Sequence, residues 1–385
     1  MGLSMPDHDE IELSVVMPCL NEESGIGTCI KKILDVFARE NIRGEIIVAD
    51  NGSVDRSKDI AREFGAKVVF EEQPGYGAAY LRGLSEARGR YIIIGDSDNT
   101  YDFYDIPKFL APLKEGFDFV MGSRFKGRIR AGAMPWMNRY LGNPILSGIC
   151  RLFFHTSLSD IHCGMRGFSR QAYLKMNLIT MGMEFATEMV VSALRNKLKI
   201  CEVSIDYDLR SGKSKLSPLA DAWRHVRFML LYSPMWLYFI PGILGFVLGG
   251  FLMAVLSSGP VFFLGRYWDI HVLAFASAWC ILSFQILNLG IYAHIFAVKQ
   301  GFLNADRLSD FFERKFDLEK GILTGALLFL AGLAINSLIF IEWLSKHFGP
   351  LYRIRESIFA LTLLVIGLQT VFSSFFISFL SLKRK

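Results

Sequence analysis

Residues 91–98, YIIIGDSD, place a short apolar run directly before two acidic side chains, and this stretch decides the fold. An unbroken apolar run of this length is typical of a strand that is buried on both faces of a sheet. Asp96 and Asp98 are two positions apart, so their side chains point to the same side if the segment stays extended. We therefore predict a buried strand over residues 91–95 that leads into a pair of carboxylates.

Strands and helices alternate around this stretch. Hydrophobic patterning predicts strands over residues 13–17, 45–49, 67–70, 91–95 and 117–121, and helices over 26–39, 57–64 and 78–87. This alternation is typical of the α/β class, with a mostly parallel, Rossmann-like sheet and helices on both faces. In such sheets the ligand crevice lies beyond the carboxyl ends of the strands.

Polar residues also follow two other predicted strands. Residues 18–23 come after the first strand and residues 50–55 after the second. Asn51 and Asp55, taken singly, are interpreted as turn or cap residues. Gly75-Tyr-Gly77 lacks the spacing of a dinucleotide-binding fingerprint, so a nicotinamide or flavin site is not expected.

The paired carboxylates of Asp96 and Asp98 suit a hard divalent cation. Mg²⁺ and Mn²⁺ prefer oxygen ligands, and Mg²⁺ in particular keeps several waters and is held by one or two carboxylates together with substrate phosphates. The alternative interpretation is a charged turn after a strand, without a ligand.

The composition averages two different regions. The chain has 385 residues, of which 52% are hydrophobic and 21% charged, and a formal net charge of +5. Residues after Leu230 hold 12 Lys and Arg and 8 Asp and Glu, which leaves 30 and 29 for residues 1–230. This composition excludes a disordered protein, and the small basic excess is not that of a nucleic-acid binder. The six cysteines form no C-x-x-C pair, which argues against a zinc site or a disulfide framework and fits a reducing cytosol.

Four segments after Leu230 are long and apolar enough to span a membrane, which takes about 20 residues. They run over residues 235–257, 272–298, 321–341 and 358–380. Trp236, Trp268 and Trp343 lie near their ends, as in an interfacial aromatic belt. We therefore predict an integral membrane protein with an all-α region of four transmembrane helices.

The basic residues of the loops predict an orientation. The second loop and the C-terminus carry more Lys and Arg than the first and third loops. The positive-inside rule then places the N-terminal domain, the second loop and the C-terminus in the cytoplasm. Residues 134–154 and 216–231 mix apolar and Arg side chains, and each is either a helix in the headgroup plane or an ordinary amphipathic surface helix.

Polar side chains also lie within the predicted spans: Gln285, Asn288, His294 and Asn336. Such groups can mark a transport path. More often they hydrogen-bond between helices, which is the interpretation we favour.

A series of motifs, taken in order along the chain, carries a family resemblance. They are Pro18…Asn21-Glu22-Glu23, Asp50-Asn-Gly-Ser53-Val-Asp55, Gly75-Tyr-Gly77, Asp96-Ser-Asp98, Gly122-Ser-Arg124-Phe125, Cys163-Gly-Met-Arg166-Gly-Phe168 and Arg210-Ser-Gly212-Lys-Ser214-Lys215. Together they resemble family 2 glycosyltransferases over about residues 11–232. The likeness is greatest to the polyprenyl-phosphate branch, the dolichyl-phosphate mannose and glucose synthases, some of which have a similar four-span tail.

The resemblance implies a GT-A fold and an inverting transfer of a hexose from a nucleotide-diphosphate sugar to a polyprenyl phosphate. By position, Pro18, Glu22 and Asp50 would line the nucleoside pocket, with Asp50 at the base edge. Asp96 would face the ribose or the metal, and Asp98 would bind the metal that bridges the diphosphate.

The basic motifs imply phosphate contacts. Arg124 would lie near the reacting phosphates, and Arg210, Ser214 and Lys215 would clamp phosphate at the membrane surface. Two departures from the family pattern matter. Asn99 and Thr100 stand where many mannose synthases have a Leu-Gln pair whose Gln helps to hold the metal, so a third protein ligand is left open. A Q-x-x-R-W motif is absent from the sequence, so polymer synthesis is not expected.

The acceptor chemistry predicts more basic residues than general bases. A phosphate monoester has a second pKa near 6 and is already an anionic nucleophile at neutral pH. Arg139 and Arg166 are therefore expected to add to the acceptor-phosphate site, although Arg166 could instead pair with an acid.

Three further residues keep two interpretations. Glu184 and Glu188, one helical turn apart, would position the sugar or a basic side chain, or would form a solvated helix face. In an enzyme with a hydroxyl acceptor, one of them would be the base. His162 is interpreted as a packed or capping residue rather than a catalyst.

The predicted organisation is a polar tail over residues 1–10, a catalytic domain over 11–215, an amphipathic segment over 216–234 and the membrane region over 235–385. The predicted reaction takes place at the cytoplasmic membrane face, with UDP-glucose weakly preferred to GDP-mannose as the donor. The expected partners are the nucleotide sugar, the polyprenyl phosphate and the bilayer, with no nucleic acid, and self-association into a homo-oligomer is left open. The alternatives are a transferase acting on a lipid or protein hydroxyl, and a transporter or anchor with an inactive domain.

Overall fold

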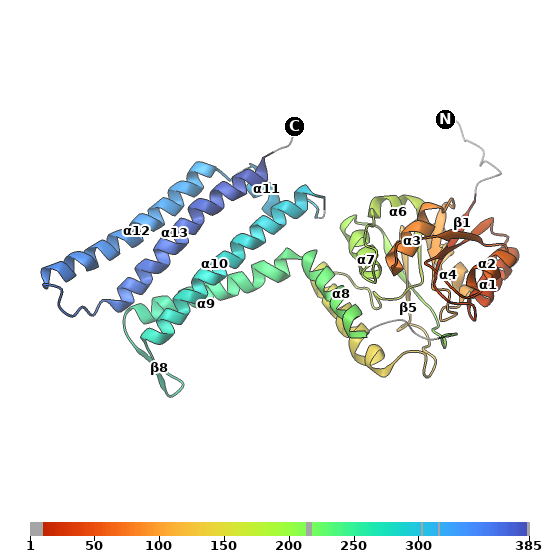
Figure 1. The fold of residues 1–385 in the computed structure, drawn as a ribbon, viewed down its shortest axis with the longest axis horizontal. Coiled ribbons are helices and arrows are strands. Elements are labelled where there is room, and N and C mark those ends of the chain that lie inside the picture. Colours follow the sequence, from red (N-terminus) through yellow and green to blue (C-terminus); the bar gives the residue numbers. More distant parts are fainter. Residues whose placement is uncertain (1–10, 213–217, 302, 315, 383–385) are drawn as a thin grey trace. The chain divides into compact units, whose positions relative to one another are not determined.

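The computed structural model describes residues 11–212, 218–301, 303–314 and 316–382. The chain divides into two compact units, of which the first ends at Met229 and the second begins at Leu230. Figure 1 shows a sheet with its helices in the first unit and the long helices of the second.

A seven-stranded sheet forms the centre of the first unit, in the order β3-β2-β1-β4-β6-β5-β7. Its strands are β1 (Leu13–Cys19), β2 (Gly44–Asp50), β3 (Lys67–Phe70), β4 (Tyr91–Ile94), β5 (Phe119–Ser123), β6 (Arg166–Ser169) and β7 (Ile200–Ser204). β1 pairs in parallel with both β2 and β4, whereas β6 pairs antiparallel with β4 and β5. The mostly parallel α/β sheet is confirmed, and the carboxyl ends of β1, β2 and β4 lie along one edge of it.

Eight α-helices lie in the described part of the chain up to Leu231, the last of which crosses the boundary between the two units. They are α1 (Ile26–Arg39), α2 (Ser57–Glu63), α3 (Tyr76–Ser85), α4 (Ile106–Lys114), α5 (Asn143–Phe154), α6 (Arg170–Met176), α7 (Phe185–Arg195) and α8 (Pro218–Leu231). α1 illustrates why they form: Ile26, Ile30 and Ile33 recur at helical spacing and are fully buried in the core.

The element limits differ from the sequence prediction by one to two residues. The predicted helix over 78–87 begins at Tyr76, because the Ala79 amide already donates to the carbonyl of Gly75 at 3.0 Å. The strand predicted over 117–121 is displaced to Phe119–Ser123. β6, which the sequence analysis did not predict, places residues 162–165 next to the end of β4.

Most of residues 134–154 and the described part of the segment before the first span are helical. The first includes a π-helical segment, η2 (Asn138–Gly142), followed by α5, and the second is α8. Trp136, Tyr140 and Trp223 have 67%, 58% and 60% of their surface exposed. Exposed aromatic side chains of this kind are compatible with a headgroup contact, which stays a prediction.

The second unit holds the four helices predicted to span a membrane. Met235–Ser257 comprises η3 (Met235–Phe239) and α9 (Ile240–Ser257), and the others are α10 (Ile270–Lys299), α12 (Leu318–Ser345) and α13 (Ile354–Ser381). A hairpin of β8 (Val261–Phe263) and β9 (Arg266–Trp268) joins α9 to α10, and α11 (Arg307–Arg314) precedes α12. All four helices are long and apolar enough to cross a bilayer.

Glycine allows α12 and α13 to approach closely. A Cβ atom added at Gly325 would lie 2.7 Å from the carbonyl oxygen of Gly367, and one added at Gly367 would lie 2.5 Å from the amide nitrogen of Phe329. Any larger side chain at these two positions would push the helices apart. Small residues at such a contact are typical of helix packing in membranes.

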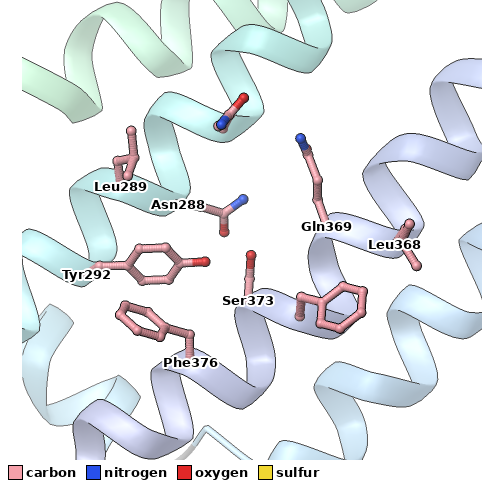
Figure 2. A pocket seen from close by; sticks show the side chains of 9 residues that line it. Asn288, Leu289, Tyr292, Leu368, Gln369, Ser373 and Phe376 are labelled. Carbon is pink, nitrogen blue, oxygen red and sulfur yellow. The ribbon is translucent and has the colours of Figure 1, made fainter.

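A cleft of about 440 Å³ lies between α10 and α13 (Figure 2). Asn288 and Tyr292 of α10 and Gln369 and Ser373 of α13 point into it. The Asn288 side chain donates to the carbonyl of Phe284 in its own helix at 3.0 Å. This amide is therefore bonded within one helix, where we had expected bonds between helices.

Candidate active site

Residues 95–100, which follow β4 and carry Asp96 and Asp98, are called the acidic loop. Hydrogen bonding connects this loop to the end of β1, at the carboxyl edge of the sheet. The Ser97 hydroxyl donates to the carbonyl of Pro18, at the end of β1, at 2.7 Å. Gly25, which precedes α1, packs against the same loop, because a Cβ atom there would lie 2.8 Å from the carbonyl oxygen of Ser97. The acidic loop is therefore held from two sides before any ligand is considered.

Asp96 lies beside a pair of tyrosines. The hydroxyls of Tyr76 and Tyr80, both on α3, donate to its Oδ1 at 3.0 and 3.4 Å. Burial, and after it the charge of Asp98, raises the pKa of Asp96 to about 7. On the other side, a Cβ atom at Gly164 would lie only 2.9 Å from Oδ2 of Asp96, so glycine leaves room for this carboxylate.

Asp98 is almost buried and connects the loop to Arg210. Its Oδ1 accepts hydrogen bonds from the amide and hydroxyl of Thr100 at 3.0 and 2.6 Å. Its Oδ2 lies 3.2 Å from Nη1 of Arg210. Nη2 of Arg210 in turn donates to Oε1 of Glu22 at 2.5 Å. The structure therefore brings together Glu22, Asp96, Asp98 and Arg210, which lie in three separate motifs of the sequence.

Asp50 has a different role from the one predicted. Its side chain is fully buried, and its carboxylate accepts the amides of Gly52 and Ser53 at 3.2 to 3.3 Å. A carboxylate without access to solvent cannot read the edge of a base. We therefore correct its assignment to organising the turn after β2.

The interpretation of Asn51 and Asp55 as turn residues is confirmed. The amide group of Asn51 bonds the backbone of Glu71, Gln73 and Gly75, and so ties the turn after β2 to the loop before α3. Asp55 accepts the amide of Glu23 at 3.1 Å.

Arg124 forms a buried ion pair and is not free to meet phosphate. Its Nε and Nη2 donate to the two oxygens of Asp160 at 2.7 and 2.8 Å, and its guanidinium lies over the ring of Tyr207. Asp160 is fully buried. The predicted place of Arg124 near the reacting phosphates is thus corrected, since its charge is already neutralised inside the fold.

Arg166 is likewise part of the interior. It is 1% exposed, and its guanidinium donates to the carbonyls of Cys163, Ala186 and Ile161 at 2.5 to 2.9 Å. Neither predicted role, a phosphate contact or a pair with an acid, describes it. Arg166 cross-links the loop before β6 to α7, and we remove it from the acceptor-phosphate site.

The remaining predicted phosphate ligands divide into two groups. Arg139 lies in η2, where its guanidinium stacks on the ring of Tyr140 with 5.4 Å to the ring centroid. Ser214 and Lys215 lie outside the described residues. Their predicted phosphate contacts therefore stay predictions.

Glu188 holds a loop in place. It is 4% exposed, and its carboxylate accepts the amides of Ile179 and Thr180 at 2.9 Å and the Thr180 hydroxyl at 2.6 Å. It is therefore neither a solvated helix residue nor placed as a base. Glu184 is half-buried just before the start of α7.

His162 is packed, as expected. Its ring meets the ring of His225 edge-on at 4.4 Å between centroids, and within the described chain its two buried nitrogens have no hydrogen-bond partner. Burial lowers the pKa of His162 well below the usual value. The imidazole is therefore neutral at physiological pH.

The acidic loop fits a divalent cation that takes most of its ligands from substrate. Across the described ranges, no group of three or more His, Cys, Asp and Glu side chains is arranged to hold a metal. The charge of Asp98 nevertheless helps to raise the pKa of the neighbouring Asp96, and a cation between the two carboxylates would offset this repulsion. Diphosphate oxygens and waters would complete the coordination, as Mg²⁺ sites commonly do.

The sequence analysis did not assign several residues of this site the contacts that they make. Tyr76, Tyr80 and Thr100 hold the two carboxylates, and Asp160 neutralises Arg124. Tyr76 lay within a quoted motif, so the pattern pointed to its position but not to its bond with Asp96.

Comparisons with known proteins identify the family of this chain. Residues 14–176 match glycosyl transferase family 2, and residues 291–381 match the glycosyltransferase family 2 C-terminal transmembrane region. The low-salt glycan biosynthesis hexosyltransferase Agl6 of Haloferax volcanii is 39% identical over 366 residues, which cover 94% of this chain and 87% of the relative. A dolichyl-phosphate hexose transferase of the same organism is 32% identical over 217 residues, 56% of this chain and 91% of the relative.

Among solved structures, glucosyl-3-phosphoglycerate synthase of Mycobacterium tuberculosis, in complex with Mn²⁺, UDP-glucose and phosphoglyceric acid, is 23% identical with a TM-score of 0.47. The match covers 57% of this chain and 78% of that one. Family assignment rests on the sequence relatives, above all on the 39% identity to Agl6 along nearly the whole chain. The resemblance drawn from the motifs is confirmed, and the chain belongs to glycosyl transferase family 2.

Proposed function

We propose that this glycosyltransferase moves a hexose from a nucleotide-diphosphate sugar to a polyprenyl phosphate at the cytoplasmic face of a membrane. The observation that carries the proposal is the cluster of Glu22, Asp96, Asp98 and Arg210 at the carboxyl edge of the sheet, in a chain with four membrane-length helices. The relative named as a dolichyl-phosphate hexose transferase supports the acceptor class. The lysine- and arginine-rich second loop and C-terminus support the cytoplasmic orientation.

The donor would bind beside the acidic loop. Asp98 and Asp96 would hold Mg²⁺ or Mn²⁺. Pro18 lies at the end of β1, and Glu22 lies in the segment that follows this strand. The cation would act as a Lewis acid that neutralises the departing diphosphate. UDP-glucose remains the preferred donor over GDP-mannose, on the family likeness alone.

The acceptor needs positioning more than it needs a base. An anionic phosphate oxygen attacks C1 of the hexose, the bond from C1 to the diphosphate breaks, and the nucleoside diphosphate leaves with the electron pair. Attack opposite the leaving group inverts the configuration at C1. Because the nucleophile carries its own charge, the enzyme must mainly hold two anionic substrates together and neutralise them.

The alternative with a hydroxyl acceptor would need a general base, and the structure weakens it. Glu188, one of the two candidate bases, is committed to the 179–180 loop. Glu184 is the remaining candidate, and a pH–rate profile that loses its acidic limb in Glu184→Gln would favour a hydroxyl acceptor.

The proposal is tested with membranes that contain the full chain, Mg²⁺ or Mn²⁺, a polyprenyl phosphate and radiolabelled UDP-glucose or GDP-mannose. We expect a labelled lipid that is stable to alkali and cleaved by mild acid. Asp98→Asn should abolish its formation, because the cation loses one of its two carboxylate ligands. Asp102→Asn is the matched control, since Asp102 lies near the same loop but pairs with Lys32 at 3.1 Å. Failure to form such a lipid from any common sugar nucleotide would refute the proposed acceptor.

A further inference from the structure

Arg210 lies between two carboxylates that belong to different parts of the predicted site. Its Nη2 is 2.5 Å from Glu22, which follows β1, and its Nη1 is 3.2 Å from Asp98, which follows β4. Both carboxylates are buried, at 6% exposure each. The guanidinium therefore supplies the positive charge that these buried carboxylates need.

The main chain holds Arg210 at this position as well. The Ser211 amide donates to the carbonyl of Asp98 at 3.0 Å. Gly212 has a φ of 111°, and a Cβ atom there would lie 3.5 Å from the hydroxyl of Ser24 and 3.8 Å from Oε2 of Glu22. Residues 210–212 thus lie against the segment after β1, and the positive φ of Gly212 permits this course of the backbone.

One donor of Arg210 is still unused. Its Nε is buried and has no hydrogen-bond partner among the residues that the structure describes. A buried donor without a partner costs free energy, so an incoming acceptor would stabilise it. A phosphate oxygen is the acceptor that guanidinium groups favour, through paired and charge-assisted bonds.

We propose that Arg210 is an internal counter-ion that the divalent cation displaces from Asp98, and that Glu22 is the positioning residue that retains it. A cation bound by Asp98 has the charge that Arg210 now supplies, so the two compete for one carboxylate. Glu22 keeps the guanidinium close by after the exchange. The freed Nη1 and the unused Nε then face phosphate beside the cation. Cation binding thereby prepares the phosphate site, which gives the two events an order.

This inference rests on the proposed function for the identity of the phosphate, but the competition itself does not. It is therefore tested first without any sugar or lipid. The Kd for Mn²⁺ is measured on the full chain in detergent by electron paramagnetic resonance, which counts free Mn²⁺ directly.

Two variants should change the affinity for Mn²⁺ in opposite directions. Arg210→Gln removes the competing charge, and we expect Mn²⁺ to bind about tenfold more tightly. Glu22→Gln removes one of the two carboxylates that Arg210 contacts, so that Arg210 pairs with Asp98 alone. Because Arg210 then competes more strongly for Asp98, Mn²⁺ should bind more weakly than in the wild type. General damage to the fold would weaken both variants alike.

Matched controls separate this effect from a change in net charge. Arg130 also forms a 3.2 Å contact from Nη1 to an aspartate oxygen, but its partner is the exposed Asp208. Arg130→Gln should leave the Kd for Mn²⁺ unchanged. Arg210→Lys keeps the charge but loses the guanidinium fork that joins two carboxylates. Its Kd for Mn²⁺ should lie between those of the wild type and Arg210→Gln.

The second half of the proposal is measured with inorganic phosphate as the probe. Wild-type protein should bind phosphate more tightly when Mn²⁺ is present, and Arg210→Gln should lose most of this gain. The inference is overturned if Arg210→Gln, with an unchanged melting temperature, binds Mn²⁺ no more tightly than wild type. If the Mn²⁺ results hold while polyprenyl phosphate is not a substrate, the proposed function fails and the counter-ion role stands.

Discussion

At the scale of single residues, charge and burial decide what each motif side chain does. Arg124 and Arg210 are both arginines in family motifs, and both contact aspartate. The side chain of Arg124 is 7% exposed and its partner Asp160 is fully buried, whereas the side chain of Arg210 is 23% exposed and shares two carboxylates. The first pair is a structural cross-link, and the second is placed at the edge of the acidic loop where ligands can reach it.

Arg124→Ala should therefore destabilise the fold. Removing one partner leaves Asp160 as an uncompensated buried charge, which costs about 3–5 kcal/mol. The melting temperature of the full chain in detergent should be clearly lower in the variant than in the wild type. The exposed pair of Arg130 with Asp208 is the control, because Arg130→Ala should cost about 0–1 kcal/mol. Normal melting with a raised KM for the acceptor would instead return Arg124 to the phosphate site.

The pH dependence of stability should reveal the buried histidine pair. Burial lowers the pKa of His225 from 6.5 to about 4, so the folded protein keeps this imidazole neutral where the unfolded chain takes up a proton. Its contribution is complete above pH 6.5 and is lost as the pH falls from about 6.5 to about 4, at about 1.4 kcal/mol per unit of pKa difference.

The comparison of His225→Gln with wild type checks this expectation. Melting temperatures measured between pH 7 and pH 4.5 should fall less steeply in the variant. His155→Asn removes an exposed histidine and should keep the wild-type slope. An equal slope in His225→Gln and wild type would contradict the assignment.

At the scale of elements, the loop over residues 179–181 supports the acidic site from behind α3. Its carbonyls lie against the start of that helix: a Cβ atom at Gly77 would be 2.2 Å from the Thr180 oxygen, and the Ala78 amide donates to Met181 at 3.1 Å. Glu188 on α7 holds the loop by its backbone amides. Because α3 also carries Tyr76 and Tyr80, this loop helps to set the position of Asp96.

Glu188→Ala should therefore lower both stability and transfer. Two backbone amides and the Thr180 hydroxyl lose a charged acceptor, and each such bond is worth about 1.5–3 kcal/mol. We expect a drop in melting temperature together with a reduced kcat. Glu184→Ala, four residues earlier, should leave the melting temperature near the wild-type value. Unchanged melting in Glu188→Ala would show that the loop holds without it.

At the scale of the whole molecule, the chain joins a charge-rich α/β unit to a charge-poor unit of membrane-length helices. The near-ordinary 52% hydrophobic content is an average of these two regions. Membership of the family covers both, because separate family matches fall on residues 14–176 and 291–381.

The proposed orientation predicts which loops meet each side of the membrane. Leu264→Cys, in the turn between β8 and β9, should react with an impermeant maleimide on intact cells. Gln300→Cys, just after α10, should react only after permeabilisation. Background labelling is limited, because all native cysteines are buried except Cys201, which is half-buried and is changed to Ser in each variant. The reverse pattern would place the catalytic unit outside the cell.

Local sequence patterns determined β1 to β5, α1 to α3 and the four spans, whereas β6 and β7 were not predicted. The apolar run before Asp96 predicted β4, the helical periodicity over residues 26–39 predicted α1 with its limits, and the four long apolar runs predicted the spans. These predictions succeed because periodicity and run length act through neighbours along the chain. The motif series also identified the family, since its members lie in order along one sequence.

Tertiary structure decided which motif residues meet and which charges are already neutralised. Sequence spacing cannot show that Asp160 takes the charge of Arg124, that Asp50 turns its carboxylate into its own loop, or that Arg210 joins Glu22 to Asp98. The two arginine contacts join segments far apart in the sequence, and the burial of Asp50 arises only in the packed fold. By itself, the sequence determined a family 2 glycosyltransferase with a membrane tail, because motif order and apolar runs are properties of the chain. The tertiary structure decided that Arg124 is neutralised by Asp160 and that Arg210 joins two carboxylates, because only packing brings these distant charges together.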